Sequence, residues 1–308
     1  MRDEGTHLTG MKIQKITGKF LRPLITKRKK KSHKGDYGKI LIVAGSKGMT
    51  GAAVLAARAA LKAGAGLVTV ACPDCEQPVI AAGVPEAMTL PLPSRNGGFA
   101  LKAAGKLAVF QEEKNYDLIL IGPGLSVKDE VPGFVIAVLK KLRLPAVVDA
   151  DALNALALAG NPGFLKTGAP RIFTPHAGEA RRLLNGKKTE RNIIIQRLAG
   201  LTGGVCVLKG PGTLVSDGRL CLANTTGGPA LAKGGSGDIL AGLIAGLWAQ
   251  AGRAKGFSMS TALESAALGV YLHGLCGDLA AEKLTGRCVL AGELLKFLPG
   301  AFRTITDK

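Results

Sequence analysis

Aromatic residues are scarce in this chain of 308 residues, where Phe, Trp and Tyr together make up 4% and tryptophan occurs once. Proteins that bind single-stranded nucleic acid commonly stack bases on aromatic side chains, so the composition argues against that mode of binding. The chain also lacks an uncharged run of about 20 residues, the length that a membrane-spanning helix requires. We therefore expect no membrane span.

Cysteine is uncommon too, and six cysteines in a chain of this length do not form the disulfide scaffold of a small secreted domain. The start of the chain holds no apolar stretch typical of a signal peptide, so we expect a cytoplasmic protein. Cys72 and Cys75 form one Cys-x-x-Cys pair, but no second pair follows to complete a zinc site. The pair could exchange disulfides, and a structural role is the interpretation we favour.

Acidic residues are outnumbered, with 22 Asp and Glu against 41 Lys and Arg and a formal net charge of +19. Such an excess suits nucleic acid, an anionic membrane or a phosphorylated small molecule. Six cations stand within eight positions: Lys27, Arg28, Lys29, Lys30, Lys31 and Lys34. We expect a basic leader at residues 1–31 and one domain at residues 32–308, with nucleic acid not the main partner, since a basic patch alone is only an electrostatic footprint.

Hydrophobic residues reach 47% of the chain, and glycine is abundant, with 43 residues. From residue 39 onward, short aliphatic runs alternate with longer segments of helical spacing, which is typical of parallel β-α-β units. The aliphatic runs predict buried strands at 39–44, 67–71, 117–121, 145–149, 171–174 and 205–209. An Asp217-Gly218 turn then predicts a β-hairpin, before helices at 238–250, 261–284 and 289–297. The pattern predicts an α/β fold with a doubly wound, mostly parallel sheet.

Several predicted strands end in unusual loops: Gly45-Ser46, Gly122-Pro-Gly124, Asp149-Ala-Asp151, Thr174-Pro-His176 and Lys209-Gly210. The carboxyl ends of parallel strands share one edge of a sheet, and ligands bind in the crevice beyond that edge. The sequence therefore predicts one site built from several loops.

The segment Gly234-Gly-Ser-Gly-Asp238 precedes a predicted helix. Glycines there let backbone amides face an anion, and the helix N-terminus adds a partial positive charge. Asp238 could cap the helix or act as a general base beside a bound phosphoryl group. The segment is neither a Walker A motif nor a dinucleotide fingerprint, so spacing alone leaves both roles open.

The other loops also have two interpretations each. The turn Lys209-Gly-Pro-Gly-Thr213 could contact nucleotide phosphates or ribose, or simply lead into the hairpin. Alternation along a strand sends Asp149 and Asp151 to the same side, where they could hold water around Mg²⁺ or cap a helix. His176 could bind a polar substrate or be structural, and the glycines of 122–124 could admit a ligand or form a turn.

These segments occur together, in the same order, in one known family. The quoted matches are Ser32-His-Lys-Gly-Asp-Tyr-Gly-Lys39, Val43-Ala-Gly-Ser46, Gly51-Ala52, Ala63-Gly-Ala-Gly-Leu67, Pro85-Glu-Ala-Met88, Ile121-Gly-Pro-Gly-Leu125, Val148-Asp-Ala-Asp-Ala-Leu153, Thr174-Pro-His-Ala-Gly-Glu179, Lys209-Gly210 and Gly234-Gly-Ser-Gly-Asp-Ile-Leu-Ala-Gly242. Over residues 32–298 the chain closely resembles the ADP- or ATP-dependent NAD(P)H-hydrate dehydratases of the ribokinase-like carbohydrate kinase group.

The resemblance implies a ribokinase-like three-layer α/β/α fold and an enzyme of nicotinamide cofactor repair. Such an enzyme takes the S form of hydrated NADH or NADPH, phosphorylates the hydroxyl of the ring with ADP or ATP, and eliminates phosphate to restore the reduced dinucleotide. The implied partners are therefore the hydrates NADHX and NADPHX and the nucleotide. Mg²⁺ is expected to bridge the phosphates, with Asp149 and Glu179 as candidate ligands.

The resemblance also implies roles for residues. Asp238 would be the base that activates the hydroxyl of the ring. The anion hole for the transferred phosphoryl group would be Gly234, Gly235, Ser236 and Gly237. The adenine nucleotide would lie on Lys209, Gly210, Pro211, Gly212, Thr213 and Gly237. The hydrate would contact Ala52, Gly124, His176 and Asp238.

Some features depart from the family or leave alternatives open. Relatives often read Asn-Pro-Thr-Gly-Asn-Pro where this chain has Asn224-Thr-Thr-Gly-Gly-Pro229, which could loosen that loop, and Lys233 adds a cation beside Gly234. We expect no room ahead of the motifs for the epimerase domain that many relatives carry, and we expect a homo-oligomer, a tetramer or larger. The alternatives are a small-molecule kinase of the same fold, acting on a hydroxylated thiazole or pyrimidine, and a nucleic-acid-binding protein that uses the basic leader.

Overall fold

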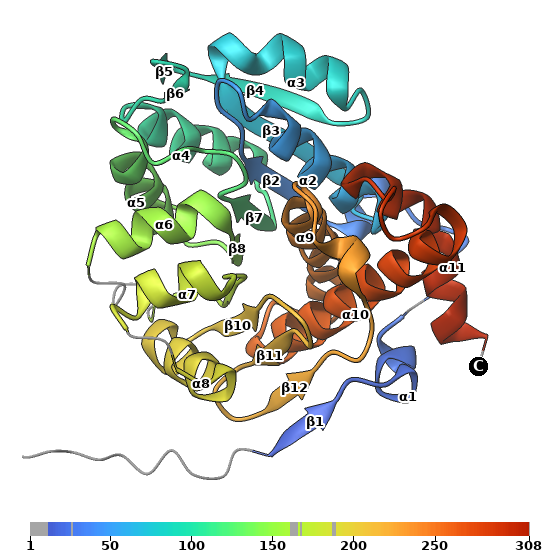
Figure 1. Cartoon of the computed structure of the whole chain (residues 1–308). Coiled ribbons are helices and arrows are strands. Elements are labelled where there is room, and N and C mark those ends of the chain that lie inside the picture. The colour runs from blue at the N-terminus through green and yellow to red at the C-terminus, as the bar shows by residue number, and fades with distance from the viewer. Residues whose placement is uncertain (1–11, 26, 161–165, 167, 187–188, 308) are drawn as a thin grey trace, which may run out of the picture.

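The computed structural model describes residues 12–25, 27–160, 166, 168–186 and 189–307. Ten of its strands form one sheet in the order β1-β12-β11-β10-β9-β8-β7-β2-β3-β4 (Figure 1). The strands are β1 Ile13–Lys15, β2 Lys39–Val43, β3 Leu67–Pro73, β4 Met88–Leu92, β7 Leu118–Ile121, β8 Ala146–Val148, β9 Arg171–Phe173, β10 Val205–Leu208, β11 Leu214–Ser216 and β12 Cys221–Ala223. A separate short ribbon joins β5 Ser94–Arg95 to β6 Gly98–Phe99.

The sheet is parallel from β4 to β10 and antiparallel only where β11 pairs with its two neighbours in the hairpin. These strands confirm the predicted mostly parallel sheet followed by a β-hairpin. In β2, Ile40 and Ile42 enter one hydrophobic core while Leu41 and Val43 enter the other. A strand that is buried on both faces reads as a continuous aliphatic run, which is why the sequence revealed these strands.

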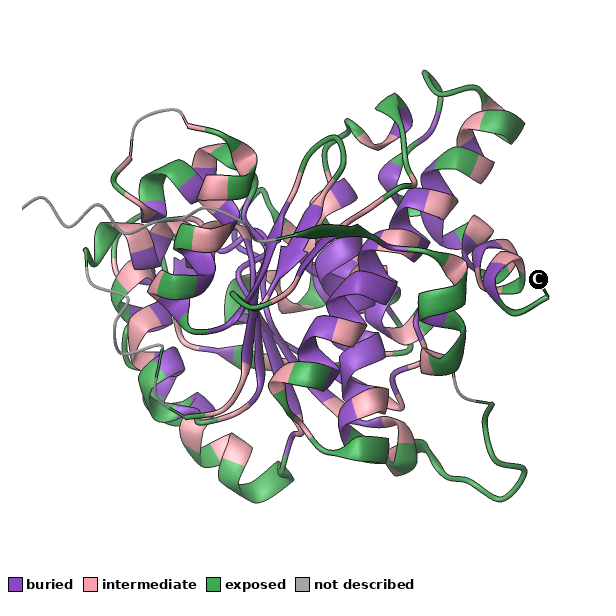
Figure 2. Ribbon diagram, turned by 90° about the horizontal axis from the view of Figure 1, so that it is seen from below, coloured by how far each residue is buried: buried purple, intermediate pink, exposed green. Residues whose placement is uncertain are grey.

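Two layers of helices cover the sheet, and Figure 2 shows the buried strands between them. One core is shared with α1 Gly18–Leu21, α2 Thr50–Lys62, α3 Gln77–Gly83, α9 Ser236–Lys255, α10 Met259–Leu284 and α11 Leu294–Thr306. The other core is shared with α4 Ala103–Lys114, α5 Val131–Lys141, α6 Ala150–Leu158, α7 Ala177–Leu183 and α8 Arg191–Thr202. This is the expected α/β/α arrangement. Within the described ranges, no helix is both long enough and apolar enough to cross a bilayer.

The helices α2 and α9 pack unusually closely, because glycines on α9 face α2. A Cβ atom at Gly242 would lie 2.2 Å from the carbonyl oxygen of Ala56, and one at Gly246 would lie 2.5 Å from that of Ala60. Since real Cβ atoms do not approach backbone so closely, both positions require glycine. The close packing fixes the N-terminus of α9, with the glycine-rich segment before it, beside the start of α2.

The N-terminal part of the chain differs from the expected leader. The domain was predicted to begin at residue 32, yet β1 pairs with β12 in the sheet, and Ile16 and Leu21 are fully buried. A strand of three residues carries too little periodicity to be recognised in a sequence. The described residues 12–25 therefore pack as part of the same unit, while residues 1–11 lie outside the described part.

The last helix also differs from its prediction. The sequence pattern predicted a helix at 289–297, which ends before Pro299, and proline in a helix interior removes a hydrogen bond and crowds the preceding turn. Instead α11 runs from Leu294 to Thr306 with Pro299 inside it. Its buried residues Leu295, Leu298 and Ile305 pack in the core beside α10, and this packing outweighs the local preference.

Candidate active site

The loops predicted to share one edge of the sheet do contact each other. The amide of Gly45, after β2, donates to the carbonyl of Pro123 at 2.9 Å, and Ser46 Oγ donates to the carbonyl of Gly124 at 2.9 Å. A Cβ atom at Gly122 would lie 1.8 Å from the carbonyl oxygen of Asp149. The loops after β2, β7 and β8 are therefore packed backbone against backbone.

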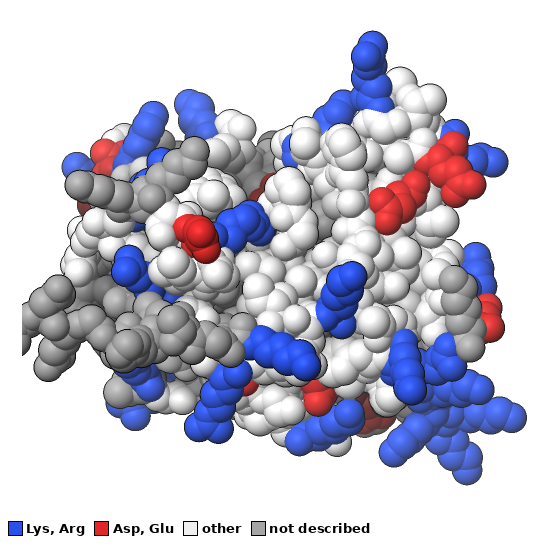
Figure 3. All heavy atoms as spheres, turned by 60° about the horizontal axis from the view of Figure 1, so that its bottom comes forward, with Lys and Arg blue, Asp and Glu red and all other residues white. Residues whose placement is uncertain are grey.

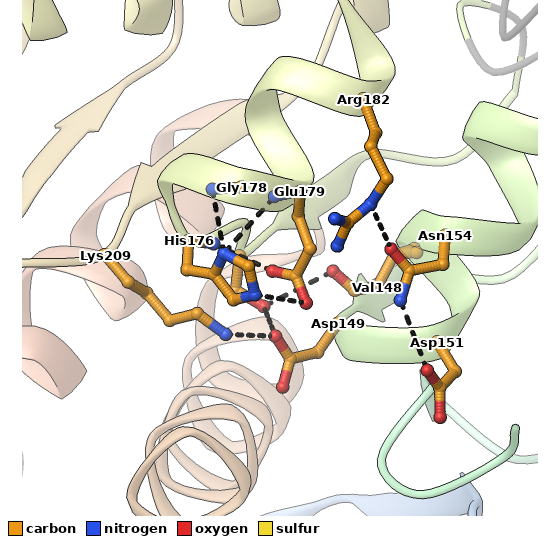
Figure 4. A network of polar contacts seen from close by, with 10 residues as sticks. Val148, Asp149, Asp151, Asn154, His176, Gly178, Glu179, Arg182 and Lys209 are labelled. Atoms are coloured by element: carbon orange, nitrogen blue, oxygen red, sulfur yellow. Dashed lines mark hydrogen bonds and ion pairs between the residues drawn. The ribbon is translucent and has the colours of Figure 1, made fainter. Parts of the chain in front are cut away.

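A buried ion pair lies at the centre of this edge. Lys209, directly after β10, donates through Nζ to Asp149 Oδ1 at 2.7 Å (Figure 4). Thr174 Oγ1 donates to the same carboxylate oxygen at 2.6 Å. Burial acts to lower the pKa of Lys209, but the charges of Asp149 and Glu179 outweigh it, and the net pKa is raised. Lys209 is therefore a fixed, permanently protonated cation.

His176 caps the start of α7 in a reciprocal arrangement with Glu179. Its Nδ1 accepts from the amides of Gly178 and Glu179 at 2.9 and 3.2 Å, while Glu179 Oε2 accepts from the amide of His176 at 2.8 Å. Burial and the nearby charges of Lys209 and Arg182 lower the pKa of His176. Burial also raises the pKa of Glu179, although Lys209 opposes that shift. A neutral ring whose Nδ1 accepts hydrogen bonds carries its proton on Nε2, and this atom lies 3.4 Å from Glu179 Oε1.

The segment Gly234–Gly237, the predicted anion hole, lies at the N-terminus of α9. Gly235, with φ +87°, turns the chain into the first residue of α9. Within the described part of the chain, the amides of Gly237 and Asp238 donate to no protein acceptor. A Cβ atom at Gly237 would lie 3.4 Å from Lys209 Nζ. A helix N-terminus with free amides and an adjacent lysine is a strong site for a phosphate.

Asp238 lies in the first turn of α9, and its environment suits a base. Burial and the charge of Asp149 raise its pKa to about 7, and Lys209 acts in the opposite direction. A general base is most effective when its pKa is near the working pH. This pKa fits the chemical role predicted for Asp238.

Ala52 and Gly124 are brought together on the other side of the site. A Cβ atom at Gly124, where φ is +62°, would lie 2.9 Å from Ala52 Cβ and 2.7 Å from the carbonyl oxygen of Met49. The glycine is required for this contact.

The turn Lys209–Thr213 is closed by a hydrogen bond from Thr213 Oγ1 to the carbonyl of Gly210 at 2.9 Å, and its residues 210–212 are exposed. They are open to a ligand.

The two carboxylates of the segment after β8 have different hydrogen-bond partners. Asp149 pairs with Lys209, whereas Asp151 Oδ2 accepts from the amide of Ser126 at 2.8 Å. Ala150 between them has φ +47°, a strained conformation for alanine. Besides burial, the charges of both carboxylates nevertheless raise the pKa of Asp238, and Asp151 also positions the loop that contains Gly124.

Asp149 and Glu179 do not fit the role of direct metal ligands. An ammonium group 2.7 Å from Asp149 Oδ1 repels a cation, and Glu179 is engaged by His176 through both oxygens. Across the described ranges, no group of three His, Cys, Asp or Glu residues is placed to hold a metal ion. Burial raises the pKa of Cys72 to about 12, which favours the structural interpretation of the Cys-x-x-Cys pair.

Sequence reasoning missed two contacts of the site. Ser236 Oγ lies 3.1 Å from Nε2 of His273 on α10, and Arg182 on α7 donates to Asn154 Oδ1 at 3.0 Å. Asn154 in turn donates to Asp151 at 3.2 Å, so the second contact ties α7 to α6 (Figure 4). Neither pair has a spacing that a sequence pattern could reveal.

Comparison with known proteins places the chain in a family. A family model described as NAD(P)H-hydrate dehydratase matches residues 40–300. An ADP-dependent (S)-NAD(P)H-hydrate dehydratase from Listeria monocytogenes is 34% identical, with 96% of this chain and 98% of that protein covered. Other curated relatives are bifunctional NAD(P)H-hydrate repair enzymes, and the chain spans about half the length of those proteins.

Solved structures agree with this placement. A ribokinase-like superfamily protein from Enterococcus faecalis is 28% identical with a TM-score of 0.79, covering 96% of this chain and 97% of the other. The ADP/ATP-dependent NAD(P)H-hydrate dehydratase from Bacillus subtilis, co-crystallised with ATP and Mg²⁺, is 32% identical with a TM-score of 0.78, covering 96% and 100%. The predicted ribokinase-like fold is confirmed, and the chain belongs to the NAD(P)H-hydrate dehydratase family.

Proposed function

We propose that this protein restores NADH or NADPH from the S form of the hydrate, with ADP or ATP as phosphate donor. The observation that carries the proposal is the meeting of three groups at one helix N-terminus. These are the free amides of Gly237 and Asp238, the ammonium of Lys209 and the carboxylate of Asp238. Together they bind a phosphoryl group and supply a base beside it. Family membership supplies the substrate class.

Asp238 starts the reaction by taking the proton from the ring hydroxyl of the hydrate. The oxygen then attacks the terminal phosphorus of the nucleotide, and the bond from phosphorus to the bridging oxygen breaks. Charge grows on the phosphoryl oxygens during this transfer. The amides at the start of α9 and the fixed cation Lys209 stabilise that charge without reorganising.

Phosphate then leaves from the ring carbon, and the lone pair of the ring nitrogen drives its departure. Loss of a proton from the adjacent ring carbon completes the double bond. The products are the reduced dinucleotide, orthophosphate and the shortened nucleotide. In this proposal Ala52, Gly124 and His176 contact the hydrate, while Lys209 to Thr213 contact the nucleotide.

We further propose that Mg²⁺ is carried by the phosphates of the nucleotide, because Asp149 and Glu179 are already occupied by protein donors. A homo-oligomer in the cytoplasm remains part of the proposal.

The basic segment 27–34 is exposed, and Figure 3 shows Lys and Arg side chains gathered at one corner of the molecule. We assign it no part in the reaction and do not propose nucleic acid as the main partner.

The direct test is incubation with hydrated NADH or NADPH and with each nucleotide in turn. Dehydration releases free orthophosphate and restores the absorbance of reduced nicotinamide in equal amounts. A small-molecule kinase of this fold would instead leave a stable phosphorylated product. Absence of hydrate-dependent phosphate release with both ADP and ATP would refute the proposal.

Asp238→Asn is the matching variant, because it is nearly isosteric and removes the base. We expect turnover to fall at least 10²-fold, in line with the usual contribution of a general base, while nucleotide affinity measured by calorimetry changes little. A variant that retains appreciable turnover would show that another group takes the proton.

A further inference from the structure

A buried polar pair lies behind the first turn of α9 and takes no part in the steps above. Ser236 is 6% exposed and His273, in the middle of α10, is 7% exposed, and their Oγ and Nε2 atoms are 3.1 Å apart. Ser236 carries the only side chain beyond hydrogen in the segment Gly234–Gly237. It is therefore the one point at which a side-chain contact can fix that segment.

The same helix holds the loop that leads into the segment. Thr226 Oγ1 donates to the carbonyl of Tyr271 at 2.9 Å, and the amide of Gly227 donates to Asp278 Oδ2 at 2.9 Å. A Cβ atom at Gly274 would lie 2.1 Å from Thr226 Oγ1, so the loop rests directly on α10. These contacts hold the loop although it lacks the first proline and the second asparagine of the pattern Asn-Pro-Thr-Gly-Asn-Pro.

The contact between Ser236 and His273 is a hydrogen bond between neutral groups. Burial lowers the pKa of His273 to about 4, and the charge of Lys209 acts in the same direction. A neutral imidazole ring offers one donor and one acceptor nitrogen, and either can bond a hydroxyl group. Leaving a buried hydroxyl without its partner costs free energy, so this bond restrains the orientation of Ser236.

We propose that His273 is a positioning residue of the reaction: its bond to Ser236 holds the first-turn amides of α9 in the orientation that binds the transferred phosphoryl group. The proposal rests on the proposed function, since it concerns the same transfer. His273 does not touch the reacting atoms. It acts through Ser236, as α10 acts on the preceding loop through Thr226 and Gly227.

The test compares single and double variants by steady-state release of orthophosphate from hydrated NADH. Because a small displacement of a catalytic group can cost up to about 10²-fold in rate, we expect His273→Leu to lower kcat about 10- to 100-fold. KM for nucleotide and hydrate should stay within about twofold. Ser236→Ala should give a similar loss, and the double variant should lose no more than the worse single variant, because both remove the same bond.

Two further variants separate positioning from packing. His273→Gln keeps a polar atom near the place of Nε2 and should restore part of the kcat lost in His273→Leu. Trp248→Phe removes another bond between α9 and α10, from Nε1 to Thr261 Oγ1 at 3.4 Å, about 18 Å along the helix from Ser236. It should lower the melting temperature without lowering kcat.

The outcomes distinguish this proposal from the proposed function. Wild-type protein that releases no phosphate from the hydrate overturns both. Wild-type turnover with an unchanged kcat in His273→Leu overturns the positioning role alone. Losses that multiply in the double variant overturn it too, because the two side chains would then act independently.

Discussion

Neighbouring groups shift the pKa of Asp238 in opposite directions. Burial and the charge of Asp149 raise its pKa to about 7, while the ammonium of Lys209 lowers it. The residue is therefore part protonated and part ionised near neutral pH. A carboxylate with an ordinary pKa would be ionised but a much weaker base, so burial at the start of α9 strengthens Asp238 for its proposed role as the base.

This balance predicts the pH dependence of the reaction. The base must be ionised in the free enzyme, so kcat/KM for the hydrate should rise about tenfold per pH unit below pH 7 and level off above it. Lys209→Met removes a charge that lowers the pKa of Asp238, so the midpoint should move to higher pH. The measurement is phosphate release across a pH series. A midpoint near pH 4, or a shift to lower pH in the variant, would contradict the assignment.

The sequence predicted the individual residues of the site better than their pairing. Glycines before a helix predict an anion site from local geometry, and Gly234–Gly237 do lie at the start of a helix. Lys209 and Asp149 are 60 residues apart, and Ser236 and His273 are 37 residues apart. Such pairs depend on how strands and helices are arranged in the fold, and no local pattern encodes them.

At the scale of the elements, the N-terminus of α9 is held in place because the backbones of α2 and α9 are nearly in contact. A Cβ atom at Gly246 would lie 2.5 Å from the carbonyl of Ala60, whereas one at Gly200 in α8 would meet nothing within 4 Å. Gly246→Ala should lower the free energy of unfolding by about 1–3 kcal/mol, because the helices must separate. Gly200→Ala should raise it by up to about 1 kcal/mol, because alanine favours a helix.

Denaturant unfolding of both variants measures these opposite signs. Equal stability of Gly246→Ala and wild type would mean that the two helices can move apart freely.

Strands and helices in this part of the fold were predicted well, because buried parallel strands form continuous aliphatic runs. The helix α11 and the strand β1 were not, because Pro299 is overridden by tertiary packing and β1 has only three residues.

At the scale of the whole molecule, the two ends of the described chain lie against each other. Arg22 donates through Nε to the carbonyl of Ile305 in α11 at 3.1 Å, and Thr225 Oγ1 donates to the carbonyl of Ile16 at 3.1 Å. The N-terminal segment thus extends the sheet at β12 and packs beside the last helix. The exposed cations that follow it add charge to the surface without adding to the core.

This division predicts different results for neighbouring substitutions. Leu21→Ala should lower the free energy of unfolding by about 2–5 kcal/mol, since Leu21 is fully buried. Replacing Lys27, Lys29, Lys30 and Lys31 with Gln should change it by no more than about 0.5 kcal/mol and leave phosphate release unchanged. Denaturant unfolding and the hydrate assay check both variants. A loss of turnover in the lysine variant would show that the basic segment takes part in the reaction. An unchanged free energy of unfolding in Leu21→Ala would show that the N-terminal segment does not contribute to the core.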